Sequence, residues 1–254
     1  MRPSRILNYV VVLALSFSII GCASVITGSA DVDKTAFCPK KRFAVVTIAS
    51  VKHFQGEKGL AQMFKSNDEF AGSNTQPMLD KLTPKILWSL DSSRNISIVP
   101  EKKVLNNKAY KNMQEDEQVM KVMFFSNEIN TARKYKYISD PKKFAKLAKK
   151  LNVDGVNLMG ISLGKKSYSA VVAASALAYD KTGKVIWKDS TVKEAEKGDS
   201  KAIIVFDTSD LTATDFEKFH PSATEMGKKA MKTLVACFGD TMAGKKVSSM
   251  QSMK

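Results

Sequence analysis

In AKLAKKLNVDGVNLMGISL, residues 145–163, a helix pattern runs directly into a strand pattern, which indicates a fold that combines helices with a sheet. Asp140 or Ser139 can cap the helix, and Pro141 suits its first turn. Residues 153–164 then have the composition of a buried strand. The apolar stripe of the helix has i, i+3, i+4, i+7 spacing and consists of Phe144, Leu147, Ala148 and Leu151.

A hairpin is predicted to follow this strand. Residues 165–180 and 184–192 form its two arms, and DKTG, residues 180–183, forms the turn, with Gly183 able to take a positive φ. Small residues crowd the first arm and would let a helix, or another subunit, lie close against it. They are Ala170, Ala173, Ala174, Ser175, Ala176 and Ala178.

Upstream, RFAVVTIASV, residues 42–51, is rich in β-branched residues and predicts a buried strand. Residues 52–74 are polar and predict a long surface loop. Apolar residues at helical spacing then predict a helix over residues 75–93. Thr75 is the expected N-cap, and Pro84 is expected to disturb the helix interior.

The remaining elements follow from the same patterns. Residues 95–100 predict a short strand, and residues 115–125 predict a helix. After a further apolar run at residues 202–206, a closing helix is expected over residues 221–238, opened by its proline and ended by Gly239.

These elements predict an α+β fold with a mixed sheet in the order βαβα-ββ-α. A helix between two strands calls for parallel pairing, and a hairpin calls for antiparallel pairing. The helices are expected to pack on the sheet. One globular domain would span residues 42–238, with a flexible tail at residues 239–254.

The beginning of the chain has the pattern of an export signal. Arg2 and Arg5 precede an apolar run from Ile6 to Ile20, which is shorter than the ~20 apolar residues of a membrane-spanning helix. The run ends in Ile-Ile-Gly-Cys, a sequence that resembles the bacterial lipoprotein processing site. We therefore predict a signal peptide over residues 1–21 and lipidation of Cys22.

Two alternatives to lipidation remain. The segment could be an ordinary signal peptide that happens to contain a cysteine, or a transmembrane anchor. On the lipoprotein interpretation, residues 22–41 form a tether from the lipid to the domain. Ala23 follows the cysteine, and in enterobacteria an aspartate there favours retention in the inner membrane. The expected location is thus the periplasmic side of the outer membrane, with the inner membrane as the second choice.

The chain is basic, with a net charge of +15. Arg2 and Arg5 account for +2 of this, which leaves +13 for residues 22–254. Such a balance suits anionic lipid head groups or acidic envelope polymers, whereas an exported protein rarely meets nucleic acid. The alternative is that the lysines are dispersed over solvated helix faces.

The sequence contains no recognisable catalytic or metal site. His53 and His220 lack a second histidine or a cysteine at ligand spacing, so no metal or cofactor is predicted. The acidic run Glu115–Glu117 has the pattern of a helix start. No nucleophile elbow or phosphate-binding loop occurs. We predict that the protein is not an enzyme.

Two further residue roles are predicted. Cys38 and Cys237 are the cysteines that remain beside Cys22, and they would form a disulfide if the closing helix packs antiparallel to the first strand. The alternative is a pair of reduced thiols. Trp187 is expected to be buried under a helix, and the alternative is an exposed anchor for a partner.

Residues 145–163 together with AYDKTGKVIWKDS, residues 178–190, resemble a family of bacterial envelope lipoproteins, the CsgG, LpoB, PelC and GNA1162 type. The resemblance covers about residues 42–238. It implies a periplasmic α/β domain without enzymatic activity that binds partners or assembles into rings. The residues that carry it are Leu151, Asp154, Gly160, Asp180, Thr182, Gly183, Val185 and Trp187.

The predicted function is a non-enzymatic, membrane-anchored lipoprotein that scaffolds or regulates an envelope machine for export or cell-wall synthesis. The alternative is an oligomeric transport subunit, a collar or pore for polymer or protein export. The chain departs from the channel type, because only residues 192–212 could be a barrel-forming insertion, and they are short and polar. The expected partners are a membrane, an envelope protein complex and, as an open possibility, further copies of this chain. An envelope hydrolase would need a nucleophile beside a base, and no such pair is visible.

Overall fold

A computed structural model describes residues 31–52, 75–122, 125–166, 169–194 and 213–245. The strands are β1 (Asp31–Val32), β2 (Lys41–Val51), β3 (Ile96–Ile98), β4 (Val119–Val122), β5 (Phe125–Thr131), β6 (Gly155–Lys166), β7 (Ser169–Asp180) and β8 (Val185–Glu194). The helices are the 3-10 helix η2 (Lys34–Phe37) and the α-helices α3 (Gln76–Asp91), α4 (Glu101–Leu105), α5 (Lys108–Lys111), α6 (Pro141–Leu151) and α7 (Ala213–Met242).

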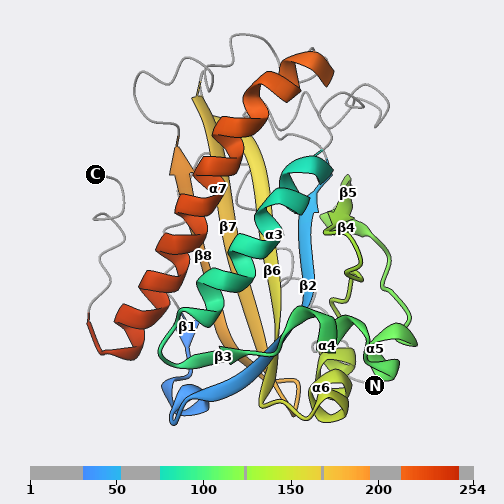
Figure 1. Ribbon diagram of the computed structural model, residues 1–254, viewed down its shortest axis with the longest axis vertical. Coiled ribbons are helices and arrows are strands. Elements are labelled where there is room, and N and C mark those ends of the chain that lie inside the picture. Colours follow the sequence, from blue (N-terminus) through green and yellow to red (C-terminus); the bar gives the residue numbers. More distant parts are fainter. Residues whose placement is uncertain (1–30, 53–74, 123–124, 167–168, 195–212, 246–254) are drawn as a thin grey trace.

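The described strands form one mixed, eight-stranded sheet (Figure 1). The strand order is β1-β8-β7-β6-β2-β5-β4, and β3 also pairs with β2 without being part of this order. β2 runs parallel to β3 and β6, and the other pairs are antiparallel. The predicted α+β fold with a mixed sheet is therefore confirmed.

Helices α3 and α7 pack side by side on one face of the sheet (Figure 1). The small side chains of Ala174, Ala176 and Ala178 belong to this core, and they let α7 lie directly over β7. Gly227 of α7 brings the two helices close, because a Cβ there would lie 2.6 Å from Cδ1 of Leu82 on α3. The predicted close approach of a helix to this strand is confirmed.

Helix α6 covers the opposite face of the sheet, with α5 packed against α6 and α4 against α5 and β2. Phe144, Leu147 and Ala148 are buried there, and the ring of Phe144 stacks on Tyr179 with centroids 4.6 Å apart. The carboxylate of Asp140 accepts a hydrogen bond from the backbone N–H of Lys142 at 2.8 Å. The predicted cap, first-turn proline and apolar stripe of this helix are confirmed.

Two local predictions are wrong. Residues 115–125 do not form a helix; β4 and the start of β5 lie there. Helix α7 is not opened by Pro221 or ended by Gly239, because it runs through both. Thr75 is the N-cap residue of α3, as predicted, but its side chain makes no capping hydrogen bond. Its hydroxyl donates instead to the carbonyl of Val51 at 2.8 Å and thereby ties the helix to β2.

Residues 31–41 of the predicted tether join the domain. β1 pairs with β8 through Asp31 opposite Lys188, and Phe37 of η2 is fully buried. The predicted loop at residues 52–74 lies outside the described residues from position 53, as do Cys22 and the apolar run at residues 202–206. Within the described part, no helix has the length and hydropathy to cross a membrane.

Candidate partner-binding surfaces

The hairpin motif is a structural turn. One carboxylate oxygen of Asp180 accepts hydrogen bonds from the backbone N–H groups of Thr182 and Lys184, at 2.8 and 3.0 Å, and from the Thr182 hydroxyl at 2.7 Å. Gly183 takes φ +86°, as predicted. Burial would raise the pKa of Asp180, but these hydrogen bonds hold it below its usual value. The motif therefore fixes the β7–β8 connection.

Asp154 has a similar structural role at the end of α6. Its carboxylate accepts a hydrogen bond from the backbone N–H of Arg42 at 2.9 Å and lies 3.7 Å from Nζ of Lys181. Its own N–H donates to the Arg42 carbonyl at 2.7 Å. The helix end is thereby joined to the start of β2, and the aspartate of the resemblance motif serves the fold.

The acidic run before β4 also has a structural explanation. The carboxylate of Asp116 pairs with Lys143 and accepts hydrogen bonds from the N–H groups of Ser139 and Asp140, at 2.7 and 3.1 Å. Burial would raise the pKa of Asp116, but these partners lower it. Asp116 thus holds the segment that leads into α6. The prediction that Glu115–Glu117 begins a helix is wrong.

Trp187 is fully buried, as predicted, which excludes the alternative that it is an exposed anchor for a partner. Its ring lies 4.6 Å from that of Phe238 on α7. In the same layer, the side chains of Trp187, Asn157 and Asp189 each bury a polar atom that has no hydrogen-bond partner among the described residues. Burial raises the pKa of Asp189 to about 7, against the lowering effect of the Ser190 N–H.

The two remaining cysteines are free thiols in the structure, Cys38 exposed and Cys237 half-buried. Their chain neighbours do meet: the rings of Phe37 and Phe238 lie 4.9 Å apart, so the end of α7 lies beside the start of β2 as expected. Burial raises the pKa of the Cys237 thiol. The disulfide is not formed in the structure and stays a prediction, which alkylation of envelope-purified protein without reductant would test.

No group of three or more His, Cys, Asp or Glu side chains in the described part is placed to hold a metal ion. His53 lies outside the described residues, and His220 lies within α7. The described carboxylates with a lowered pKa, which are Asp33, Asp116 and Asp180, each hold a turn or an ion pair. These three carboxylates therefore stabilise the fold.

One exposed aromatic side chain stands out on the α3–α7 side. Trp88 of α3 is 68% exposed, and among the residues whose side chains the structure describes it is the one exposed large apolar residue. Lys81, Pro84 and Lys85 are exposed on the same helix. Sequence reasoning missed this residue, although the α3 pattern holds the signal: the buried stripe through Leu82, Ile86 and Leu90 leaves position 88 on the outer face.

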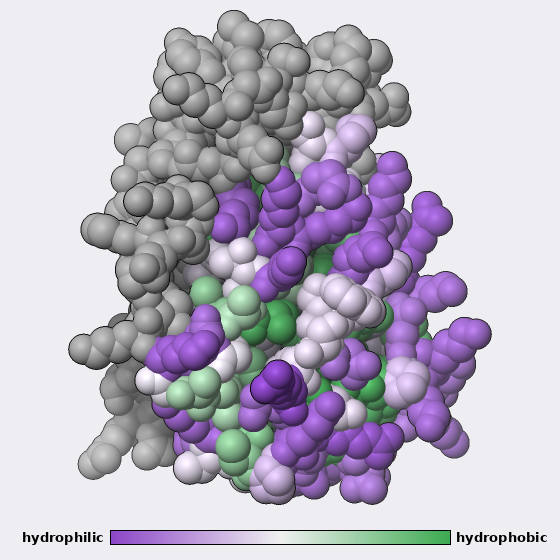
Figure 2. Space-filling view, turned by 60° about the vertical axis from the view of Figure 1, so that its left-hand side comes forward, coloured by the Kyte–Doolittle hydropathy of each residue, from purple (hydrophilic) through white to green (hydrophobic). Residues whose placement is uncertain are grey.

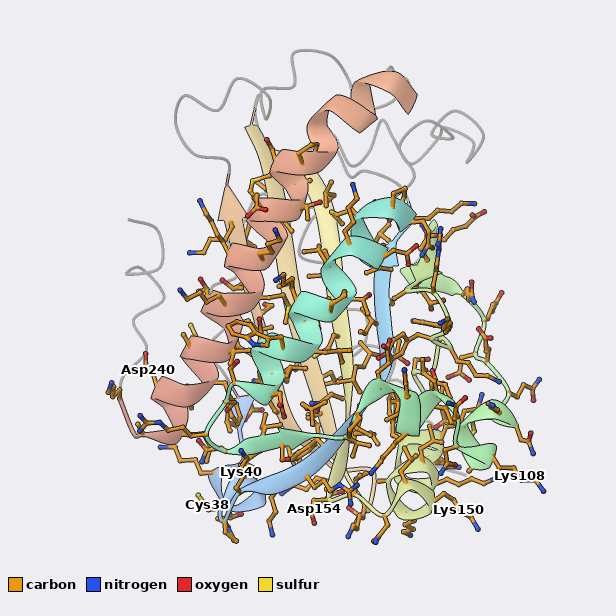
Figure 3. The ribbon with its side chains drawn as sticks, viewed as in Figure 1. Cys38, Lys40, Lys108, Lys150, Asp154 and Asp240 are labelled. Carbon is orange, nitrogen blue, oxygen red and sulfur yellow. The ribbon has the colours of Figure 1, made fainter. Side chains whose placement is uncertain are left out.

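The described surface seen on the α7 side is largely hydrophilic (Figure 2). Figure 2 shows hydrophilic side chains over most of the described face on the α7 side, with smaller apolar patches between them. In Figure 3, Lys40, Lys108 and Lys150 reach outward at the lower end of the molecule. The candidate sites are therefore surfaces: the outer face of α3 around Trp88, and a lysine-rich end formed by α4, α5 and α6.

Comparison with known proteins gives structural matches only. No family model matches the sequence, and no curated protein matches it. The structure resembles the LpoB C-terminal domain from Salmonella enterica, with 10% identity, a TM-score of 0.33 and coverage of 73% of this chain and 93% of that one.

Two further structures are similar. Lipoprotein GNA1162 from Neisseria meningitidis has 15% identity and a TM-score of 0.31, covering 63% of this chain and 84% of that one. The PelC dodecamer from Paraburkholderia phytofirmans has 12% identity and a TM-score of 0.28, covering 76% and 86%. The predicted resemblance to these envelope lipoproteins is confirmed as a structural similarity at low sequence identity.

Proposed function

We propose that this chain is a non-enzymatic, lipid-anchored protein of the bacterial envelope that binds a partner protein through the outer face of α3 around Trp88. In this role it scaffolds or regulates an export or cell-wall machine. The observation that carries the partner-binding part is the exposure of Trp88, 68%, on a helix whose other large apolar residues are buried or half-buried.

An exposed tryptophan is a strong candidate for a binding anchor. Tryptophan is enriched among the few interface residues that dominate binding free energy, and it offers a large apolar surface at low cost in side-chain entropy. Trp88 also stands on a fixed support, because Leu82, Ile86 and Leu90 of the same helix are fully buried. A partner would therefore meet the ring in a defined position.

The surroundings of Trp88 indicate the charge of that partner. Lys81 and Lys85 are exposed on the same side of α3, and no acidic side chain in the described part pairs with either. Charged residues at the rim of an interface mainly steer association and select partners. An acidic surface surrounding an apolar pocket would fit this face.

The lipid anchor rests on the sequence Ile-Ile-Gly-Cys at residues 19–22. Acylation of Cys22 with two or more chains would hold the domain stably at a membrane. The non-enzymatic role is supported by the described carboxylates, whose partners join elements of the fold. Together these features favour a protein that acts by holding another protein.

Photo-crosslinking tests the partner surface directly. A photoreactive residue is placed at position 88 in cells, and the crosslinked species is identified by mass spectrometry. The matched control carries the same residue at Gln114, which is exposed on the α6 side of the sheet. We expect a discrete envelope protein crosslinked at position 88 and absent at position 114.

Two results would contradict this proposal. A crosslink between two copies of the chain would favour the oligomeric collar or pore. Absence of any product specific to position 88 would show that this face does not bind a partner. As a second readout, Trp88→Ala should weaken binding of the captured partner by at least about 30-fold, the effect of losing a ~2 kcal/mol hot spot. Its stability should change by no more than about 0.5 kcal/mol, because the side chain is exposed.

A further inference from the structure

We infer that the lysine-rich outer face of α6, extended by α4 and α5, rests on an anionic lipid bilayer and orients the tethered domain on it. This inference depends on the lipid anchor of the proposed function. It goes beyond that function by assigning a second surface and the chemistry of what it meets.

Helix α6 divides its residues sharply between two faces. Its inner face packs Phe144, Leu147 and Ala148 into the core. Five of its eleven residues are lysines, and it contains no acidic residue. Four of these lysines are exposed: Lys142, Lys146, Lys149 and Lys150.

These four lysines have no anionic partner among the described residues. Lys143, the fifth, is the one that pairs, and its partner is Asp116. The neighbouring helices add further exposed lysines to the same surface. They are Lys102 and Lys103 on α4, and Lys108 and Lys111 on α5.

The position of this surface fits the course of the chain. Figure 1 shows α4, α5 and α6 at the lower end of the long axis, where η2 also lies, and Figure 3 shows Lys108 and Lys150 at that end together with Cys38. The described chain begins at Asp31, in β1 beside η2. Eight residues, 23–30, lie between Cys22 and this point. A chain of that length reaches at most about 30 Å, so an anchored Cys22 keeps this end near the bilayer.

A bilayer suits this surface better than a folded partner does. The exposed positions of α6 hold lysines without an aromatic or large aliphatic side chain among them, and the large exposed apolar residue, Trp88, lies on the other side of the sheet. A protein interface needs apolar anchors, whereas anionic lipid attracts clustered lysines by charge alone. The α6 face on the membrane would leave α3 and Trp88 facing away, free for a partner.

Lysine labelling tests the inference on the whole protein. The chain is purified from membranes in detergent and reconstituted into two kinds of vesicle, phosphatidylcholine alone and phosphatidylcholine with about one-third phosphatidylglycerol. A brief pulse of an amine-acetylating reagent is followed by mass spectrometry of each lysine. Lys81, Lys85 and Lys232, exposed on α3 and α7, are the internal controls.

We expect acetylation of Lys146, Lys149 and Lys150 to slow severalfold in the anionic vesicles and the control lysines to be unchanged. The difference should vanish in 1 M salt, where the screening length is about 3 Å. Each lysine near an anionic surface strengthens binding about fivefold. Changing these three to glutamine should therefore abolish the protection of Lys142, Lys102 and Lys108, which are exposed on the same surface, and the same change at the three controls should leave that protection intact.

Equal acetylation in the two vesicles, with the protein retained on both, would overturn the inference and leave the lipid anchor standing. Loss of the protein from both vesicles on washing would instead show that the anchor is absent. In that case the free protein is mixed with the same vesicles. Co-sedimentation with the anionic vesicles alone would support binding of the lysine-rich face to anionic lipid, and absence of co-sedimentation would contradict it. Protection of the α6 lysines only after addition of an acidic envelope protein would assign the surface to a protein partner and contradict the inference.

Discussion

Trp187 shows, at the residue scale, how the hairpin is held under α7. Its side chain is fully buried, and the centroid of its ring lies 4.6 Å from that of the Phe238 ring. We expect Trp187→Ala to destabilise the protein by about 3–5 kcal/mol, because the substitution removes a large buried ring and leaves a cavity. Chemical denaturation measures this, with Trp88→Ala as the exposed control. An unchanged midpoint for Trp187→Ala would contradict the packing described.

Asp189 makes a different prediction, because its carboxylate is buried with one oxygen unpartnered. Its folded pKa is raised to about 7, whereas an unfolded aspartate titrates near 3.9. The folded state therefore binds more protons between about pH 4 and 7, and Asp189 costs stability increasingly as the pH rises through that window. Above pH 7 the loss in free energy of unfolding reaches an upper bound of roughly 4 kcal/mol, because each pKa unit corresponds to about 1.4 kcal/mol.

The variant Asp189→Asn should remove this pH dependence. We expect it to unfold at a higher denaturant concentration than the parent at pH 8 and at nearly the same concentration at pH 4. Denaturation of both proteins from pH 4 to pH 8 measures the difference between their midpoints. The contributions of other titrating groups cancel in this difference, because both proteins contain them. A constant difference between them at all pH values would show that Asp189 is not a buried acid.

Some of these residue roles follow from the sequence. Gly183 was predicted to take a positive φ because DKTG has the pattern of a turn, and the structure agrees. The burial of Asp189 had a signal too, since it lies two residues after Trp187 and strand alternation puts both on one face. Trp88 was not found, although the buried stripe through Leu82, Ile86 and Leu90 leaves position 88 on the outer face of α3.

At the scale of elements, two glycines make opposite predictions. A Cβ on Gly155, at the start of β6, would lie 2.4 Å from Cε1 of Phe43 and 2.5 Å from the carbonyl oxygen of Tyr179. Because that carbonyl belongs to the paired strand, Gly155→Ala should destabilise the protein by about 1–3 kcal/mol. A Cβ on Gly239 in α7 would meet nothing within 4 Å. Gly239→Ala should therefore stabilise it by up to about 1 kcal/mol through helix propensity.

Thermal or denaturant unfolding of the two variants decides this pair. Destabilisation by Gly239→Ala would mean that α7 does not continue through that residue. An unaffected Gly155→Ala would mean that β6 does not lie as close to Tyr179 of β7 and Phe43 of β2 as described.

The elements that were predicted correctly have strong local signals. Helix α6 has a cap, a first-turn proline and an apolar stripe, and β6, β7 and β8 carry long β-branched or small-residue runs. Residues 115–125 were predicted wrongly because a short run such as Val-Met-Lys-Val fits a helix or a strand equally, and pairing of β4 with β5 decides between them. The proline in α7 resembled a helix start, but the helix tolerates it at an exposed position.

At the scale of the whole molecule, the sequence predicted the mixed sheet and the chain order but not the faces. Periodicity shows which side of a helix is apolar, and it does not show which face of the sheet that side meets. In the structure α3 and α7 cover one face and α6 covers the other. That division separates Trp88 from the lysines of α6, so the proposed partner surface and the proposed membrane surface point in different directions.

The lipid anchor is the claim on which this orientation depends, and the mass of the N-terminal peptide of the mature protein tests it most directly. We expect a mature chain that begins at Cys22 and carries acyl groups on it, and a Cys22→Ala variant that is not cut between residues 21 and 22. A mature protein with an unmodified Cys22, or one cut at another bond in both the parent and the variant, would contradict that claim.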